Sequence, residues 1–354
     1  MQQPNRLDHY RLLGRSGLRV SPLALGSMTF GADWGWGADE TESRRIFDAY
    51  VERGGNFIDT ASNYTNGSSE TLVGKFAQGR RERLVLATKY SLLTQPGNPN
   101  ACGNHRKNMR QSVERSLRRM GTDYIDLLYL HVWEGRTPVA EILRSFDDLV
   151  SSGKVLYVGI SDTPAWQVAR MQVISELRGW APLVALQIEY SLVQRTVERE
   201  LIPMASELGL GVLPWSPLAG GVLAGKYSRS DLSANPTAVP SGSRKEVALA
   251  HGMLTERALE IAELVKRIAS EKGHSPSQVA LAWTLQNPAI TAPIIGARTL
   301  QQLEDNLGAL DVHFSEAELR ALDQISSIEL GFPHDLFRLE LVKQVLSGGM
   351  HIAA

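Results

Sequence analysis

The chain alternates short apolar runs of strand length with longer stretches of helical periodicity from one end to the other. Between the runs, apolar residues recur at helical spacing, as at Ile46, Ala49 and Tyr50, which predicts amphipathic helices that pack on a sheet. Strands that alternate with helices form a parallel sheet, so an α/β fold is expected. The predicted strands span 23–25, 56–58, 84–87, 127–130, 156–160, 184–187, 211–214 and 292–295.

Eight strand-helix units in one chain favour a closed (β/α)8 TIM barrel over an open sheet. The open dinucleotide-binding fold predicts a G-x-G-x-x-G turn after an early strand, and no stretch of this chain matches it. No Pro/Ser-rich linker divides the 354 residues, so we expect a single barrel domain over 1–354, although the length alone would also allow two domains.

Three segments are expected to add to the barrel. Residues 1–22 contain two apolar stretches around Gly14–Gly17, which predicts an N-terminal hairpin. Residues 227–246 are polar and irregular, which predicts a long loop after the seventh strand, and loops of this length are often functional lids. Residues 331–354 form a C-terminal tail. Among helix starts, Thr163-Pro164 and Ser275-Pro276 both have the pattern of an N-cap followed by proline at the first helical position.

Composition excludes several classes of partner. The chain has 37 basic and 38 acidic residues, so no overall field favours nucleic acid or an anionic membrane surface. Its single cysteine, Cys102, cannot form an internal disulfide, and residues 1–10 are polar where a secretory signal would be apolar. The longest apolar runs fall far short of the ~20 residues that span a bilayer. A cytoplasmic protein is therefore expected, while the sequence does not indicate its oligomeric state.

Four ionisable or phenolic residues follow predicted strands. Asp59 comes directly after the second strand, Lys89 after the third and His131 after the fourth, while Tyr64 lies in the loop behind Asp59. Active sites of such barrels lie at the carboxyl ends of the strands, so all four side chains are expected at one mouth. Each residue also has a purely structural explanation, because a strand-end Asp is often a cap or turn residue and a lone His or a loop Tyr often only packs against its neighbours.

The four residue types have compatible chemistry. Buried Asp and Lys side chains are costly unless paired, so Asp59 and Lys89 are expected to bond each other. An ammonium beside a phenol lowers the phenol pKa from ~10 towards neutrality, which suits Tyr64 to proton transfer. His131 supplies a second hydrogen-bond donor for a carbonyl oxygen.

Three segments carry a family resemblance. Gly55–Tyr64 places an Asp and a Tyr five positions apart, Ala87–Lys89 ends in a lysine, and Tyr124–His131 ends in a histidine. In this order the chain resembles the aldo-keto reductases over nearly its whole length, in the branch that includes bacterial members and potassium-channel β subunits. The resemblance implies hydride transfer between NADPH and a carbonyl carbon. It implies Tyr64 as proton donor, Lys89 as the group that lowers the Tyr64 pKa, Asp59 as the partner of Lys89, and His131 as the group that orients the substrate oxygen.

The resemblance also implies cofactor-binding positions. Ser161, Asp162 and Gln187 correspond to the group that holds the nicotinamide amide, and Trp215 to the ring that stacks on the nicotinamide. Arg298 is expected to bind the 2′-phosphate, because a guanidinium matches phosphate geometry, and NADPH is therefore expected over NADH. The remaining positions implied for NADPH binding are Met28, Ser216, Pro217, Leu218, Gly220, Lys226, Gly296, Gln302, Asp305 and Asn306.

The chain departs from the family pattern at three places. Thr65 follows Tyr64 where Gly is usual, and Asp162 stands where Asn is usual. An ionised Asp162 only accepts hydrogen bonds, so it can bond the carboxamide NH2 but not the carboxamide oxygen. Gly296-Ala297 replaces the Lys-Ser of the best-known branch, which leaves more of the 2′-phosphate recognition to Arg298.

The substrate is expected to be a small carbonyl or alcohol compound. Trp34, Trp36 and Trp133 lie in or just after the predicted mouth loops and would form aromatic walls suited to apolar or ring-containing compounds, although ordinary loop packing explains them equally well. An alternative function is an NADPH-binding regulatory or sensor protein with little turnover. A phosphosugar isomerase or aldolase on the same barrel is a third.

Two other motifs are rejected. Gly220–Lys226 matches the first seven positions of a nucleotide-triphosphate P-loop, but Tyr227 stands where Ser or Thr must hold Mg²⁺. The histidines are scattered without the spacing of a metal site, so no metal is expected.

Overall fold

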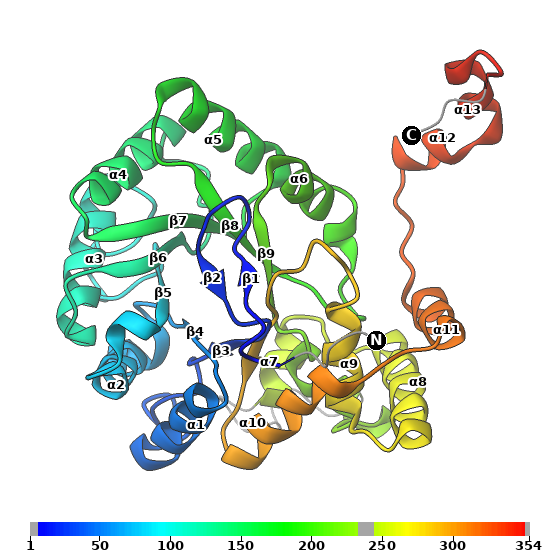
Figure 1. The fold of residues 1–354 in the computed structure, drawn as a ribbon, viewed down its shortest axis with the longest axis horizontal. Coiled ribbons are helices and arrows are strands. Elements are labelled where there is room, and N and C mark those ends of the chain that lie inside the picture. The colour runs from blue at the N-terminus through cyan, green and yellow to red at the C-terminus, as the bar shows by residue number, and fades with distance from the viewer. Residues whose placement is uncertain (1–5, 233–243, 351–354) are drawn as a thin grey trace.

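The computed structural model describes residues 6–232 and 244–350. Eight parallel strands lie in the order β10-β3-β4-β5-β6-β7-β8-β9, and a parallel bridge between Val212 of β9 and Ile290 ahead of β10 brings the two edges together. Figure 1 shows helices around the outside of these strands. The strands are β3 (Ala24–Gly26), β4 (Phe57–Asp59), β5 (Val85–Tyr90), β6 (Ile125–Leu130), β7 (Val155–Ser161), β8 (Leu183–Glu189), β9 (Gly211–Trp215) and β10 (Ile294–Gly296).

The predicted (β/α)8 barrel is therefore confirmed, with each of the eight expected strands present to within a few residues. The helices that follow the strands are also at the expected places. They are α1 (Glu40–Glu52), α2 (Ser68–Ala77), α3 (Arg106–Met120), α4 (Val139–Ser151), α5 (Ala165–Arg178), α6 (Leu201–Leu208), α8 (Glu256–Lys272), α9 (Pro276–Thr284) and α10 (Leu300–Leu307).

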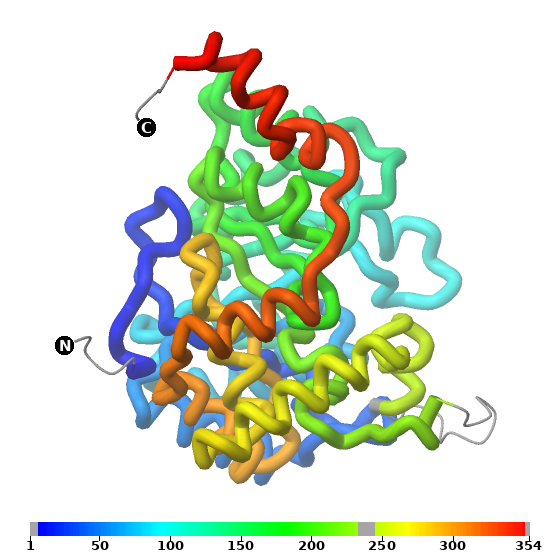
Figure 2. The backbone as a smooth tube through the Cα atoms, turned by 90° about the vertical axis from the view of Figure 1, so that its right-hand side faces the viewer, coloured from blue at the N-terminus to red at the C-terminus, as the bar shows by residue number. Residues whose placement is uncertain are grey.

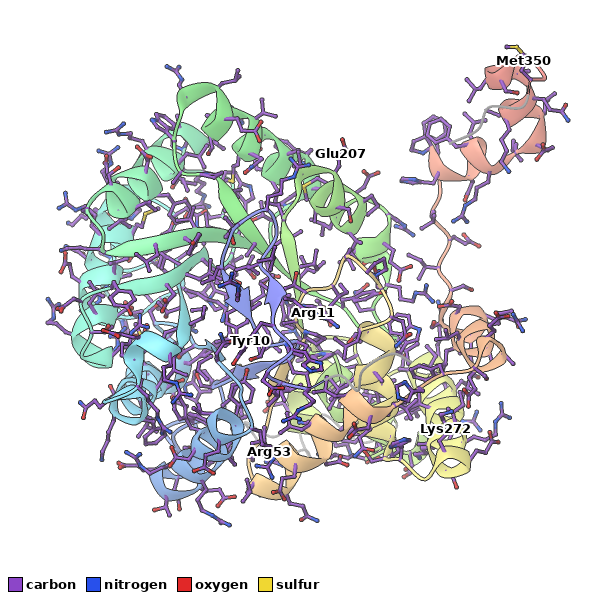
Figure 3. All side chains as sticks on the ribbon, viewed as in Figure 1. Tyr10, Arg11, Arg53, Glu207, Lys272 and Met350 are labelled. Carbon is purple, nitrogen blue, oxygen red and sulfur yellow. The ribbon has the colours of Figure 1, made fainter. Side chains whose placement is uncertain are left out.

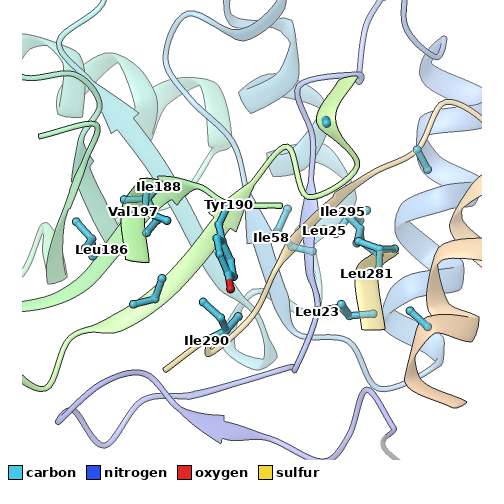
Figure 4. Close-up of a cluster of buried hydrophobic side chains, with 14 of the residues drawn as sticks. Leu23, Leu25, Ile58, Leu186, Ile188, Tyr190, Val197, Leu281, Ile290 and Ile295 are labelled. Carbon is cyan, nitrogen blue, oxygen red and sulfur yellow. The ribbon is translucent and has the colours of Figure 1, made fainter. Parts of the chain in front are cut away.

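Strand parity divides the core into two layers. Residues such as Phe57, Ala87 and Leu213 form an inner cluster that fills the barrel. Their strand neighbours point outward and pack against the helices in a second, larger cluster. Figure 4 shows part of that outer cluster, including Leu186 and Ile188 on β8. Because successive residues of a strand face opposite sides, the parity also decides which strand-end residues reach the barrel mouth.

The N-terminal hairpin closes the opposite end of the barrel from the mouth. Strands β1 (Arg11–Leu12) and β2 (Arg19–Val20) are antiparallel, as predicted, and Leu13 and Val20 are fully buried in the inner cluster. The Arg11 guanidinium, labelled in Figure 3, donates to two backbone carbonyls ahead of β10. At Gly14, where φ is +57°, an added Cβ would lie 2.5 Å from the carbonyl oxygen of Gly209, so glycine permits this close approach.

One helix cap differs from the prediction. Ser275 caps α9 in a capping box with Gln278, and Pro276 is the first helical residue, as expected. At α5, however, Pro164 itself is the N-cap and the helix begins at Ala165. The reason is local, because Pro164 has an extended ψ of 143° and the Thr163 hydroxyl donates to the Ser161 carbonyl instead of capping the helix.

The long connection after β9 contains short helical segments, namely η4 (Ala219–Gly221), η5 (Arg229–Asp231) and α7 (Arg244–Ala250). Helix α7 packs against η4, where Ala248 lies next to Gly220. Residues 233–243, at the centre of the expected loop, lie outside the described residues. The expected lid is therefore described only at its two flanks.

After α11 (Glu316–Ser326) the chain leaves the barrel. Helices α12 (His334–Arg338) and α13 (Glu340–Ser347) stand away from the strands in Figure 1 and lie at the top of the view in Figure 2, and Figure 3 labels Met350 near the far end. The His334 ring contacts Glu200 at a distance of 3.0 Å near the start of α6. Among the described helices, none is long and apolar enough to cross a membrane.

The buried position of the hairpin gives a stability prediction. Leu13→Ala removes a fully buried side chain from the inner cluster, so we expect the free energy of unfolding to fall by about 3 kcal/mol. Leu12→Ala, on the same hairpin but 58% exposed, is the control and is expected to change it by about 0.5 kcal/mol or less. Urea unfolding measures both variants. Equal losses would show that the hairpin does not seal the barrel.

Candidate active site

The polar residues at the carboxyl ends of the strands converge on one mouth. Asp59 ends β4, Lys89 lies next to the end of β5, and His131 follows β6 directly. Each has the same parity as the inner cluster residues on its strand, namely Phe57, Ala87 and Tyr129, so all three side chains face the barrel axis. Adjacent strands β4, β5 and β6 hold them side by side.

A buried ion pair forms the centre of the site. The Lys89 ammonium donates to Asp59 Oδ1 at 2.5 Å and to the Thr60 carbonyl at 2.8 Å. The second carboxylate oxygen of Asp59 accepts from Gln187 Nε2 at 2.9 Å. Lys89 is 0% exposed and Asp59 is 3% exposed, so both charges depend on these partners for compensation. The structure thus brings Asp59 and Lys89 together as expected and joins Gln187 to them.

Tyr64 lies on the open side of this pair. It begins a short helical turn, η1 (Tyr64–Gly67), and Lys89 Nζ donates to its hydroxyl at 3.2 Å. The same nitrogen lies 4.8 Å from the centroid of the Tyr64 ring, and the His131 ring stands edge-on to it with centroids 5.9 Å apart. The four expected residues therefore form one contiguous group.

Thr65 has a structural role in this turn. Its φ is +43°, a left-handed conformation that favours glycine. The side chain compensates with two hydrogen bonds, because its hydroxyl donates to the Phe30 carbonyl at 2.8 Å and accepts from the Ser69 N–H at 3.0 Å. Thr65 thereby ties the Tyr64 turn to the loop after β3.

The pKa directions refine the expected electrostatics. Burial disfavours the Lys89 ammonium, but Asp59 and Tyr64 outweigh burial and raise the pKa of Lys89. For Tyr64, burial raises the pKa and the Lys89 charge lowers it, and the net pKa lies above the ordinary value. The expected shift of Tyr64 towards neutrality is therefore corrected, because desolvation exceeds the effect of Lys89. The phenol holds its proton at neutral pH.

His131 is a neutral imidazole in this setting. Burial, with a further contribution from the Lys89 charge, places the pKa of His131 well below its usual range. Its Nδ1 is buried and has no hydrogen-bond partner among the described residues. A neutral ring carries one N–H donor, so His131 can donate to an oxygen in the mouth without introducing a second cation.

The strands on the far side of the mouth supply a second group of polar residues. The Trp215 indole N–H, at the end of β9, donates to Asp162 Oδ1 at 2.9 Å. Asp162 has a φ of +39° and lies at the solvent-exposed rim, where desolvation by the surrounding protein still raises its pKa. Ser161 is buried and its hydroxyl has no partner among the described residues. Of the expected amide-binding residues, Asp162 bonds Trp215 through one oxygen, Gln187 bonds Asp59 through its nitrogen, and the Ser161 hydroxyl forms no hydrogen bond with the described residues.

The turn after Trp215 is compact. Ser216 and Ala219 have left-handed φ values, and the Ser216 hydroxyl accepts from the Gly220 N–H. The N–H groups of Ala219 and Gly221 donate to carbonyls within the same turn. Pro217 and Leu218 lie between Ser216 and Ala219. The Lys226 side chain lies close to Gly221, since a Cβ added at Gly221 would be 3.5 Å from Lys226 Cδ.

A helix N-terminus lies beside the β10 end of the mouth. Thr299 caps α10, and the exposed Arg298 precedes it with its backbone N–H bonded to the Gln302 side chain. In the described part of the chain the Arg298 guanidinium has no acidic partner. Asn306 Nδ2 donates to the Gly296 carbonyl, and Asp305 Oδ1 accepts from Gln278 Nε2.

Aromatic side chains line one side of Tyr64. The Trp34 ring lies 6.4 Å from the Tyr64 ring and 5.7 Å from the Trp36 ring, measured between centroids. Trp133 lies elsewhere on the rim, where its backbone N–H donates to the Asp162 carbonyl at 3.3 Å. Met28 is half-buried just after β3. Trp34 therefore lies beside Tyr64 with Trp36 behind it, and their role as a substrate wall stays a prediction.

Sequence reasoning missed Glu189. This residue ends β8 and has the inward parity of Gln187, and its Cα is paired with that of Trp215. Its position at a strand end could have identified it in the same way as Asp59. Desolvation by burial and, to a lesser extent, the Asp162 charge raise the pKa of Glu189 to about 7.

A (β/α)8 barrel with Tyr64, Lys89, Asp59 and His131 grouped at its mouth is the arrangement of a barrel enzyme that uses a tyrosine as proton donor. Comparison with known proteins gives the family. The chain belongs to the Aldo/keto reductase family, whose model matches residues 22–327. The resemblance expected from the sequence is confirmed. Members of this family transfer hydride between a nicotinamide cofactor and a carbonyl or alcohol, so the chain is an oxidoreductase.

Three relatives illustrate the similarity. The chain is 36% identical over 345 residues to norsolorinic acid reductase of Aspergillus flavus, covering 94% of this chain and 84% of the relative. It is 41% identical over 326 residues to an uncharacterized oxidoreductase of Bacillus subtilis, covering 89% and 95%. It is 34% identical over 352 residues to an NADP(+) aryl-alcohol dehydrogenase of Phanerodontia chrysosporium, covering 95% and 90%.

The neutral state of His131 can be measured directly. We expect the ring resonances of His131 in isotope-labelled protein not to titrate between about pH 8 and pH 6, because burial disfavours the imidazolium. In Lys89→Met the pKa of His131 should rise, since one of the two causes of its depression is removed, while remaining below the usual value. A His131 that titrates near pH 6.5 in both proteins would contradict the described environment.

Proposed function

We propose that this protein reduces aromatic aldehydes or ketones with NADPH, and catalyses the reverse oxidation, with Tyr64 as the proton donor and acceptor. The observation that carries the proposal is the hydrogen bond of 3.2 Å from Lys89 to the Tyr64 hydroxyl, with Lys89 itself held by Asp59. The bond places a dissociable proton at the open side of a buried ion pair, beside the neutral donor His131.

The described residues fit a nicotinamide cofactor. The unpartnered Ser161 hydroxyl and the Asp162 carboxylate offer a donor and an acceptor for a carboxamide. The Trp215 ring, fixed through its N–H by Asp162, offers a planar face for stacking. When bound, the cofactor supplies the hydride. Trp215, Ser161 and Asp162 hold and orient its reactive ring.

The 2′-phosphate of NADPH is assigned to Arg298. This guanidinium has no acidic partner in the described part of the chain and stands directly before the N-terminus of α10. A guanidinium fork beside a helix N-terminus suits a phosphate dianion. The run from Ser216 to Gly220, with Lys226 behind it, would line the diphosphate, and Gly296, Gln302 and Asn306 would lie at the adenosine end.

The proton chemistry follows from the site geometry. In reduction the Tyr64 hydroxyl donates its proton to the carbonyl oxygen, and the raised pKa of Tyr64 keeps that proton available at neutral pH. Lys89 then stabilises the phenolate through its charge, and Asp59 keeps Lys89 protonated and in place. His131 donates a second hydrogen bond to the same oxygen and orients it.

The aromatic wall supports the assignment of substrate class. Trp34 stands next to Tyr64 and Trp36 next to Trp34, and ring-containing carbonyl compounds would stack on them. One relative has a name that points the same way, since it is called an aryl-alcohol dehydrogenase. Both the contact geometry and this name support an aromatic substrate.

Removal of the Tyr64 hydroxyl tests the catalytic assignment. We expect Tyr64→Phe to lower kcat for an aromatic aldehyde by about 10²- to 10⁴-fold, since a positioned general acid contributes that much, and to leave the NADPH dissociation constant nearly unchanged. NADPH absorbance measures turnover. Tyr10→Phe, whose hydroxyl bonds the Gly54 carbonyl outside the mouth, is the control. Tight NADPH binding without turnover in the unaltered protein would favour a sensor and refute the proposal.

Removal of the Arg298 guanidinium tests the cofactor assignment. Arg298→Ala should raise the NADPH dissociation constant by about 10-fold and change that for NADH little, because a charge-assisted phosphate contact is lost. Arg53→Ala is a matched control, since Arg53 also lies near α10 but is paired with Glu304 at 2.7 Å. Isothermal calorimetry measures both cofactors. Equal losses for NADPH and NADH would sink the assignment.

A further inference from the structure

The wall of the mouth formed by β7, β8 and β9 carries two carboxylates. Asp162 directly follows β7 and bonds the Trp215 indole N–H at 2.9 Å. Glu189 ends β8 with its Cα paired to that of Trp215, and its inward parity directs the side chain to the mouth. In the described part of the chain neither carboxylate forms an ion pair. Two acidic groups thus flank the Trp215 ring, on which the nicotinamide is proposed to stack.

The charged groups around Glu189 are few. From β7 the Asp162 carboxylate faces it, and β9 contributes only Trp215. On the following segment Arg195 and Glu198 pair with each other at 2.9 Å on the outer side of the barrel. Across the mouth, the Lys89 charge is compensated by Asp59, and His131 is neutral. The Lys89 charge still acts on Asp162 from across the mouth and lowers its pKa against the larger effect of burial, but no ion pair of the described residues joins a cation to Glu189 or Asp162.

The nicotinamide ring changes charge in the reaction, because it is cationic in NADP⁺ and neutral in NADPH. The rest of the cofactor, including its phosphates, is the same in both forms. We propose that Glu189 and Asp162 form an electrostatic selector that stabilises the oxidised ring and so favours NADP⁺ over NADPH at this site. The proposal rests on the proposed function, because it requires the nicotinamide to lie against Trp215.

The selector is expected to depend on pH. Glu189 has a pKa of about 7, raised by desolvation and by Asp162, so it is mostly protonated at pH 6 and mostly ionised at pH 8. As the pH rises, a negative charge develops beside the ring and stabilises the cation of NADP⁺ but not the neutral ring of NADPH. Binding of NADP⁺ should also lower the pKa of Glu189, and so release protons near pH 7.

The test is the ratio of the two dissociation constants, Kd for NADP⁺ over Kd for NADPH, measured by isothermal calorimetry at about pH 6 and about pH 8. We expect the ratio in the unaltered protein to fall by about 3- to 10-fold over this range, as an opposite charge within reach of a carboxylate shifts its pKa by roughly one unit. Titration of the phosphates is common to both cofactors and cancels in the ratio.

Variants identify the group responsible. Glu189→Gln should make the ratio independent of pH, and Asp162→Asn should raise it at both pH values. Glu207→Gln, an equal change of charge on the exposed surface of α6, labelled in Figure 3, should behave as the unaltered protein does. A ratio that is flat in the unaltered protein, or that keeps its pH dependence in Glu189→Gln, would overturn the proposal.

Two further readouts separate the possible failures. If neither cofactor binds, the proposed function fails and this inference fails with it; if both bind with a pH-independent ratio, only the inference fails. If Glu189→Gln does not fold, the proposal can still be tested on the unaltered protein by measuring proton release. Calorimetry near pH 7 in two buffers of different ionisation enthalpy should then show more protons released with NADP⁺ than with NADPH, and equal release would contradict the selector.

Discussion

The buried ion pair between Lys89 and Asp59 is the interaction on which the site depends. Moving each charge out of water costs several kcal/mol, and the attraction between them compensates only when the remaining hydrogen-bonding positions are also filled. Here Thr60 and Tyr64 complete the contacts of the ammonium, and Gln187 completes those of the carboxylate. The proton donor is therefore part of the network that makes the buried charge tolerable, so its position cannot vary independently of the pair.

The barrel meets this requirement by separating its two ends. At the end near the hairpin, the inward positions are apolar and Leu13 and Val20 close the interior. At the other end the same inward positions of β4, β5 and β8 carry Asp59, Lys89 and Gln187. Side chains from three strands meet only because parallel strands end on the same side, which is why a charge network and a dry core coexist in one barrel.

Much of this arrangement follows from the sequence, because strand periodicity and strand ends are local features. The eight strands and the meeting of Asp59, Tyr64, Lys89 and His131 could be predicted in that way. The net pKa of Tyr64 could not, since it depends on how much protein surrounds the phenol. The bond from Gln187 to Asp59 and the bond from the Thr65 hydroxyl to Phe30 join segments distant in sequence. The cap of α5 depends on the backbone angles of Pro164, which the residue types at 163 and 164 do not determine.

The charged groups at the mouth are separated by sign, with the cation on one side and two carboxylates on the other. Lys89 stands on the Tyr64 side, while Asp162 and Glu189 stand on the Trp215 side. In the proposed reduction, negative charge develops on the carbonyl oxygen as positive charge develops on the nicotinamide ring. Fixed groups of opposite sign at the two places stabilise that separation without reorganising during the reaction. In the proposed selector the same carboxylates would also hold the oxidised cofactor after the reaction, so faster hydride transfer would be coupled to slower release of NADP⁺.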